Sequence, residues 1–132
     1  MTQHIHHINF IVRDLAAAVP VWERVLNQQV TSLDRLDARG VNTARFDLGQ
    51  SWIVLVQPIR AGTVPAIYLE QHGEGFFLMS LGTNSLQAEI ERLGEAVFDG
   101  PERDGLDDWR VRDIAATGIF GAQVQFVEDS DS

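Results

Sequence analysis

The feature that most constrains the fold of this chain is one order of strands and helix that occurs twice. Residues 5–12 are rich in β-branched and aromatic side chains, as strands are. Asp14 follows as a candidate N-cap, and apolar residues recur at helical spacing from Leu15 to Leu26. Pro20 lies inside this stripe and is expected to kink or delay the helix. Further strand patterns occupy residues 29–37, 41–48 and 52–57, so the first half predicts the order β-α-β-β-β.

The second half shows the same order after a connector rich in Pro and Gly, residues 59–75. Residues 76–81 form a strand pattern, and Asn84 or Ser85 is expected to cap a helix with an apolar face from Leu86 to Leu93. The remaining predicted segments are a short strand at 96–98, a polar loop at 100–108, and strands at 109–114 and 120–128. The halves match in pattern rather than in identity.

A chain of 132 residues has the size of one domain. We therefore expect an α+β fold with a single domain over residues 1–132, built from two β-α-β-β-β units, residues 4–58 and 76–128. Each unit presents a sheet whose faces must be covered. The economical arrangement has helices outside and a concave sheet face that encloses a ligand cavity.

Charge and composition exclude several classes of function. All ten basic residues are Arg, and with 19 acidic residues they leave a formal net charge of −9, which disfavours nucleic acid as a partner. The absence of Lys excludes Schiff-base and P-loop lysine chemistry, and the absence of Cys excludes thiol nucleophiles, disulfides and zinc-thiolate sites. No segment approaches the roughly 20 apolar residues of a membrane span, so we expect a cytoplasmic protein without a membrane partner.

The sequence resembles the vicinal oxygen chelate superfamily, which includes glyoxalase I, methylmalonyl-CoA epimerase, extradiol dioxygenases and bleomycin-type resistance proteins. The resemblance is carried by HINFIVRDL at residues 7–15 and IVLVQP at residues 53–58. It extends through GEG at residues 73–75, which precedes a strand, to the closing GAQVQFVE at residues 121–128. It implies the glyoxalase-like fold, with the methylmalonyl-CoA epimerase and glyoxalase-like branch as the most similar.

The resemblance also places four metal-ligand positions, one on the first and one on the last strand of each half. Metal-using members carry a ligand at each of these positions. In chain order the ligands are a His, then either a Glu or a Gln, then a second His, and last a Glu. The corresponding residues are His7, Val54, Leu78 and Gln125. Aliphatic side chains have no lone pair and an amide is a weak ligand, so we expect the metal ligands to be lost and no metal or other cofactor to be bound.

Strand alternation predicts the side chains that line the cavity. His7 is the candidate catalytic residue, because a neutral imidazole can both accept and donate a proton. The candidate substrate-binding residues are Asn9, Trp52, Val54, Leu78, Ser80, Gln123 and Gln125. An alternative is that Asn9, Ser80 and the glutamines only satisfy one another in a filled core.

The other histidines are expected at the surface. Alternation places His4 and His6 on the face opposite His7, and His72 lies in the connector. A shift of one residue would turn His6 inward. We reject that shift because the spacing from His7 to Asp14 matches the family pattern.

Two classes of function remain open for a protein that binds a small, largely apolar oxygenated molecule. The first is a metal-independent isomerase, epimerase or lyase with His7 as acid or base. The second is a non-catalytic protein that binds or sequesters an antibiotic-type molecule. A metal-dependent epimerase or lactoylglutathione lyase is a weaker third reading, because Val54 and Leu78 argue against it. Family members of this size commonly pair, so a homodimer is expected.

Overall fold

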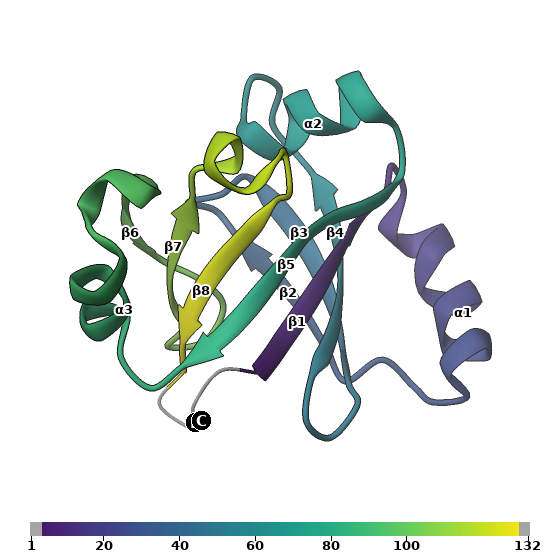
Figure 1. Ribbon diagram of the computed structural model, residues 1–132. Coiled ribbons are helices and arrows are strands. Elements are labelled where there is room, and N and C mark those ends of the chain that lie inside the picture. Colours follow the sequence, from purple (N-terminus) through teal and green to yellow (C-terminus); the bar gives the residue numbers. More distant parts are fainter. Residues whose placement is uncertain (1–3, 130–132) are drawn as a thin grey trace. The chain divides into compact units, whose positions relative to one another are not determined.

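The computed structural model describes residues 4–129 and is a mixed α+β structure (Figure 1). Its elements, in chain order, are β1 (His4–Ile11), α1 (Leu15–Leu26), β2 (Ser32–Leu36), β3 (Val41–Asp47), β4 (Trp52–Pro58), α2 (Val64–His72), β5 (Gly75–Thr83), α3 (Leu86–Leu93), η1 (Glu95–Val97), β6 (Phe98–Asp104), β7 (Arg110–Ile114), η2 (Ala116–Ile119) and β8 (Val124–Glu128). The predicted order β-α-β-β-β is confirmed in both halves, and α2 lies between them.

Contacts along the chain define two compact units, and their limits differ from those of the sequence halves. One unit comprises residues 8–77, and the other combines residues 78–129 with residues 4–7. Within the first, the strands lie in the order β2-β3-β4-β1, and within the second in the order β1-β5-β8-β7-β6. The first residues of β1, which include His6 and His7, therefore belong to the same unit as the second half of the chain.

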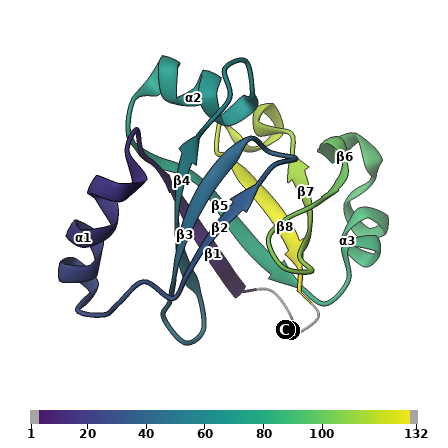
Figure 2. The same cartoon turned by 180° about the vertical axis from the view of Figure 1, so that it is seen from behind.

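In the unit of residues 8–77, α1 packs on β3 and β4 (Figures 1 and 2). Asp14 caps the helix as predicted, because its carboxylate accepts a hydrogen bond from the Ala17 backbone at 3.3 Å. The helix is continuous through Pro20, so the expected delay is wrong. The apolar face of α1 covers a fully buried cluster of Ala44, Phe46 and Leu55. The free energy gained from this packing outweighs the loss of the backbone hydrogen bond that Pro20 cannot donate.

In the other unit, α3 packs against β6, β7 and β8, and Figure 2 shows it beside β6 and β7. Ser85 is the N-cap, and its hydroxyl accepts a hydrogen bond from the Ala88 backbone at 3.1 Å. Leu86 from the helix forms a buried cluster with Phe98 and Phe126 from the strands. Through this cluster α3 packs on one face of β8 and stabilises the strand that also contains Gln125.

Several predicted boundaries are wrong. The expected loop at 100–108 begins as strand, since β6 extends to Asp104, and the expected strand at 96–98 is mostly the 3₁₀ helix η1. Pro and Gly made β6 resemble a loop, but it is an edge strand, and its register with β7 shifts between Asp99 and Arg103, which edge strands tolerate. β2 is shorter than predicted, and β8 starts only at Val124, after η2.

Within residues 4–129, no helix is long and apolar enough to cross a membrane.

Candidate functional site

A buried group of polar side chains surrounds His7 in the unit of residues 4–7 and 78–129. Ser80 on β5 and Gln125 on β8 are neighbours in a parallel strand pair. A hydrogen bond of 2.8 Å joins Ser80 Oγ to His7 Nε2, and Gln125 Nε2 donates to Ser80 Oγ at 2.5 Å. His7 is 3% exposed and Ser80 0%. The structure thus brings together three of the side chains that the sequence predicts for the site.

Arg103 on β6 determines which way the Gln125 amide points. Its guanidinium donates to Gln125 Oε1 at 3.1 Å, and it also forms an ion pair with Asp113. Because a guanidinium has no acceptor, the atom it contacts must be the amide oxygen. The amide nitrogen of Gln125 therefore faces Ser80 and acts as a donor there.

His6 lies on the other side of His7, and its predicted place at the surface is wrong. It is 4% exposed, its Nδ1 lies 2.9 Å from His7 Nδ1, and its Nε2 lies 2.8 Å from Asp129 Oδ2. Trp109 stacks on the His7 ring at 4.9 Å between centroids and meets the His6 ring edge-on at 4.6 Å. This shared packing holds both rings, although alternation along a strand would point them to opposite faces. His4 is exposed, as expected.

The surroundings of His6 favour its neutral form. Burial lowers the pKa of His6 below its ordinary value, because a charged imidazole loses hydration there. The hydrogen bond and the charge of Asp129 act in the opposite direction but do not reverse the shift. His6 is therefore an uncharged imidazole at neutral pH, beside a carboxylate.

The remaining predicted residues divide between the two units. Leu78 is buried and Gln123 half-buried in the unit that contains His7. Asn9, Trp52 and Val54 belong to the unit of residues 8–77. There, Val54 is buried, the Asn9 side-chain oxygen is buried without a hydrogen-bond partner, and the Arg45 guanidinium lies 5.0 Å from the centre of the Trp52 ring.

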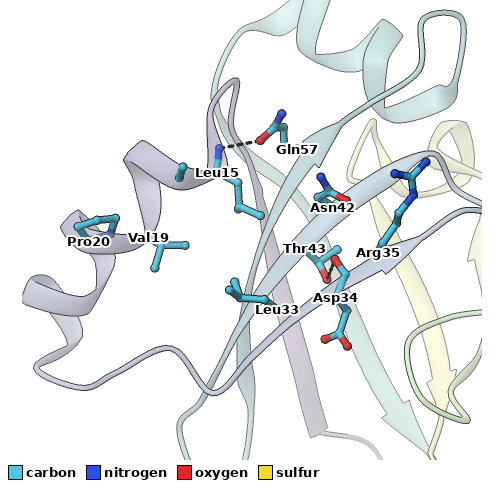
Figure 3. A pocket seen from close by; sticks show the side chains of 10 residues that line it. Leu15, Val19, Pro20, Leu33, Asp34, Arg35, Asn42, Thr43 and Gln57 are labelled. Carbon is cyan, nitrogen blue, oxygen red and sulfur yellow. Dashed lines mark hydrogen bonds between the residues drawn. The ribbon is translucent and has the colours of Figure 1, made fainter.

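A separate groove of about 610 Å³ lies in the unit of residues 8–77, between α1 and the outer face of β2 to β4 (Figure 3). Its wall is apolar and comes from Leu15, Val19 and Pro20 of α1. Its floor is a polar row across adjacent strands, Arg35, Asn42 and Gln57. Gln57 also accepts a hydrogen bond from the Leu15 backbone at 2.8 Å. The volume is typical of small-molecule sites, but the residues that line the groove include none of the predicted site residues.

Sequence reasoning missed four residues of the polar group: His6, Arg103, Trp109 and Asp129. Only His6 had a usable indication in the sequence, because it directly precedes the candidate base. The other three reach the site from loops and an edge strand, whose facing cannot be read from a hydrophobic pattern. Among residues 4–129, no three or more His, Cys, Asp or Glu side chains come together as a group that could hold a metal ion.

Comparison with known proteins gives a family and a fold. The family model described as "Glyoxalase/Bleomycin resistance protein/Dioxygenase superfamily" matches residues 6–112. An uncharacterized protein of Bacillus subtilis (strain 168), YqjC, is 23% identical over 127 residues, which cover 94% of this chain and 91% of that protein.

Two solved structures show the same fold. Hypothetical protein BH1468 from Bacillus halodurans C-125 superposes with a TM-score of 0.92 at 20% identity, covering 100% of this chain and 98% of the other. A Streptomyces coelicolor methylmalonyl-CoA epimerase, in complex with 2-nitronate-propionyl-CoA, gives 0.87 at 19% identity, covering 98% and 99%. These likenesses confirm the predicted glyoxalase-like fold. Since the family match runs from the histidine pair on β1 into β7, the chain belongs to the glyoxalase, bleomycin resistance protein and dioxygenase superfamily.

Proposed function

We propose that this protein is a metal-independent enzyme of the isomerase, epimerase or lyase type, in which His7 is the acid or base. The observation that carries the proposal is the buried Ser80 hydroxyl between two polar side chains. Its oxygen lies 2.8 Å from His7 Nε2 and 2.5 Å from Gln125 Nε2. An imidazole beside a hydroxyl that is shielded from water is a proton-transfer pair at neutral pH. The substrate class is a small oxygenated molecule with an acidic C–H next to a carbonyl group.

Two considerations support this chemistry. An epimerase that acts next to a carbonyl group needs only to remove a proton and return it, so a neutral imidazole suffices. Methylmalonyl-CoA epimerase is also the activity named for one of the structures that share this fold.

The proposed metal independence is supported by the side chains at the positions where metal-using relatives carry ligands. Val54 and Leu78 offer no donor atom, and Gln125 already bonds to Ser80 and Arg103. A divalent ion needs several oxygen or nitrogen ligands to replace its water shell. These residues do not fit a metal ion of the family type.

The second candidate function is binding without catalysis. It is favoured by the groove of about 610 Å³ beside α1, whose apolar wall and polar floor suit a small amphipathic molecule. In this reading, the polar group at His7 only satisfies its members in a packed core.

The proposal is tested by proton exchange in D₂O. The purified protein is incubated with a panel of 2-substituted carbonyl compounds and thioesters that includes methylmalonyl-CoA, and mass spectrometry follows deuterium incorporation. We expect exchange at the carbon next to the carbonyl for at least one compound, with the same rate after treatment with EDTA. Loss of exchange in EDTA, restored by a divalent ion, would contradict metal independence. Absence of exchange across the panel, with a bound ligand in the groove, would favour the second candidate.

We also propose that the protein is a homodimer. The end strands of the two units, β2 and β6, leave one edge each without a neighbouring strand in the described residues, and such edges invite pairing. Light scattering at micromolar concentration is expected to give twice the mass of one 14.7 kDa chain. A mass equal to one chain would refute the dimer.

A further inference from the structure

We infer that Asp129 and His6 hold His7 in its Nδ1–H tautomer, so that Nε2 is the proton-accepting atom. Together with Ser80 they form a proton relay, Ser80–His7–His6–Asp129, from a buried hydroxyl to a carboxylate near the surface. The catalytic use of this relay rests on the proposed function, whereas the tautomer does not. In this relay, His6 and Asp129 are positioning residues that act through His7.

The direction of the relay is set at Asp129. A carboxylate only accepts hydrogen bonds, so the His6 Nε2 atom, 2.8 Å from Asp129 Oδ2, must carry a proton. His6 is neutral because its burial lowers its pKa, and a neutral imidazole has one ring proton. The Nδ1 atom of His6 is therefore an acceptor.

The same reasoning applies to the ring of His7. The two Nδ1 atoms lie 2.9 Å apart, so an acceptor on His6 requires a proton on His7 Nδ1. With its ring proton on Nδ1, His7 has a lone pair on Nε2, and the Ser80 hydroxyl donates to that atom over 2.8 Å. Gln125 supports this direction, because it donates to Ser80 Oγ and leaves the hydroxyl proton free to point at His7.

Proton movement along the relay keeps both rings uncharged. His7 Nε2 takes the hydroxyl proton of Ser80 as His7 Nδ1 gives its own proton to His6 Nδ1. His6 Nε2 in turn gives its proton to Asp129, whose side chain is 13% exposed and can release it to water. Ser80 recovers a proton from the substrate C–H. Every bond to hydrogen that breaks is replaced, and no charged imidazole is needed in a buried site.

The tautomers are measured by long-range ¹H–¹⁵N NMR on protein with labelled histidine, at a pH of about 8, above the ordinary histidine pKa. His6→Gln and His7→Gln assign the ring signals. We expect His7 to be protonated at Nδ1 and unprotonated at Nε2. We expect His6 to be protonated at Nε2 and unprotonated at Nδ1. The opposite assignment for His7 would overturn the inference.

Variants identify which residue controls the tautomer. Asp129→Ala removes the acceptor for His6 Nε2–H, and we expect His7 to shift toward the Nε2–H tautomer, two residues along the relay. Asp99→Ala, which removes an exposed carboxylate of the same unit, is the matched control and should change nothing. Ser80→Ala should leave the His7 tautomer unchanged. A tautomer that survives Asp129→Ala but is lost in Ser80→Ala would assign control to Ser80 and refute the role of Asp129.

Asp129→Asn separates the relay from the proposed activity. The amide oxygen can still accept from His6 Nε2–H, so the tautomers should stay, but an amide does not take up a proton at neutral pH. Deuterium exchange on a compound that the wild type turns over should fall, by less than the roughly 10²- to 10⁴-fold effect of removing a general base. Unchanged exchange would eliminate the relay while the proposed activity stands. If no compound exchanges with the wild type, the NMR assignment still decides the tautomer.

Discussion

His7→Gln is expected to lower turnover by about 10²- to 10⁴-fold, because it removes the proton-transfer group of the proposed mechanism. Glutamine is the better replacement for this position than alanine. His7 packs on Trp109 and bonds to Ser80, and alanine would leave a gap and a buried hydroxyl without its partner. The side-chain oxygen of glutamine can still accept a hydrogen bond from that hydroxyl, although it cannot take up its proton. The measurement is the rate of deuterium incorporation, with circular dichroism to verify the fold.

Two further results decide between the candidate functions. If the protein only binds its ligand, in the groove beside α1, His7→Gln should leave the affinity unchanged. Leu33→Ala should weaken binding, because Leu33 is an exposed apolar residue that lines this groove. Undiminished turnover by a folded His7→Gln protein would remove His7 from the mechanism. His72→Gln is the matched control, since His72 lies at the exposed end of α2, beside Tyr68 in the other unit.

Phe46→Ala is expected to lower the free energy of unfolding by about 3 to 5 kcal/mol. Phe46 is 0% exposed, and it lies with Ala44 and Leu55 under the apolar face of α1. Removal of the ring takes away buried apolar area and leaves a cavity that the strands cannot close. Chemical denaturation with urea gives the change.

Val25→Ala is the control for this loss of packing. Val25 is 70% exposed on the same helix, so the change should stay within about 0.5 kcal/mol. Equal effects of Phe46→Ala and Val25→Ala would show that the cluster beneath α1 does not stabilise the fold as the structure indicates.

The fold was largely predictable because local patterns and packing agree. Asp14 and Ser85 cap their helices as the sequence indicates, and the β-α-β-β-β order appears in both halves. Strand β6 was not predictable. Its Gly100 and Pro101 are typical of loops, and only its place at an edge, beside β7, lets such residues adopt strand geometry.

The candidate site was only partly predictable. Alternation along strands identified His7, Ser80 and Gln125, which the structure joins by hydrogen bonds. It failed for His6, because the position of that ring depends on Trp109 and Asp129, which follow it by more than a hundred residues. Strand periodicity contains no information on partners so distant in the sequence. The role of His7 in catalysis stays a prediction, and so do the substrate-binding roles of Asn9, Trp52, Val54, Leu78, Ser80, Gln123 and Gln125.

The sequence distances within the His7 group also determine when it forms. All contacts within residues 8–77 become available once that continuous segment has been synthesised. In contrast, His7 and Ser80 are 73 positions apart, and His6 and Asp129 are 123 apart. The ribosome makes His6 more than a hundred residues before its carboxylate partner, and contacts between residues so distant in the sequence form slowly. The two rings therefore reach their final arrangement only after residue 129 has been synthesised, later than the contacts within residues 8–77 become available.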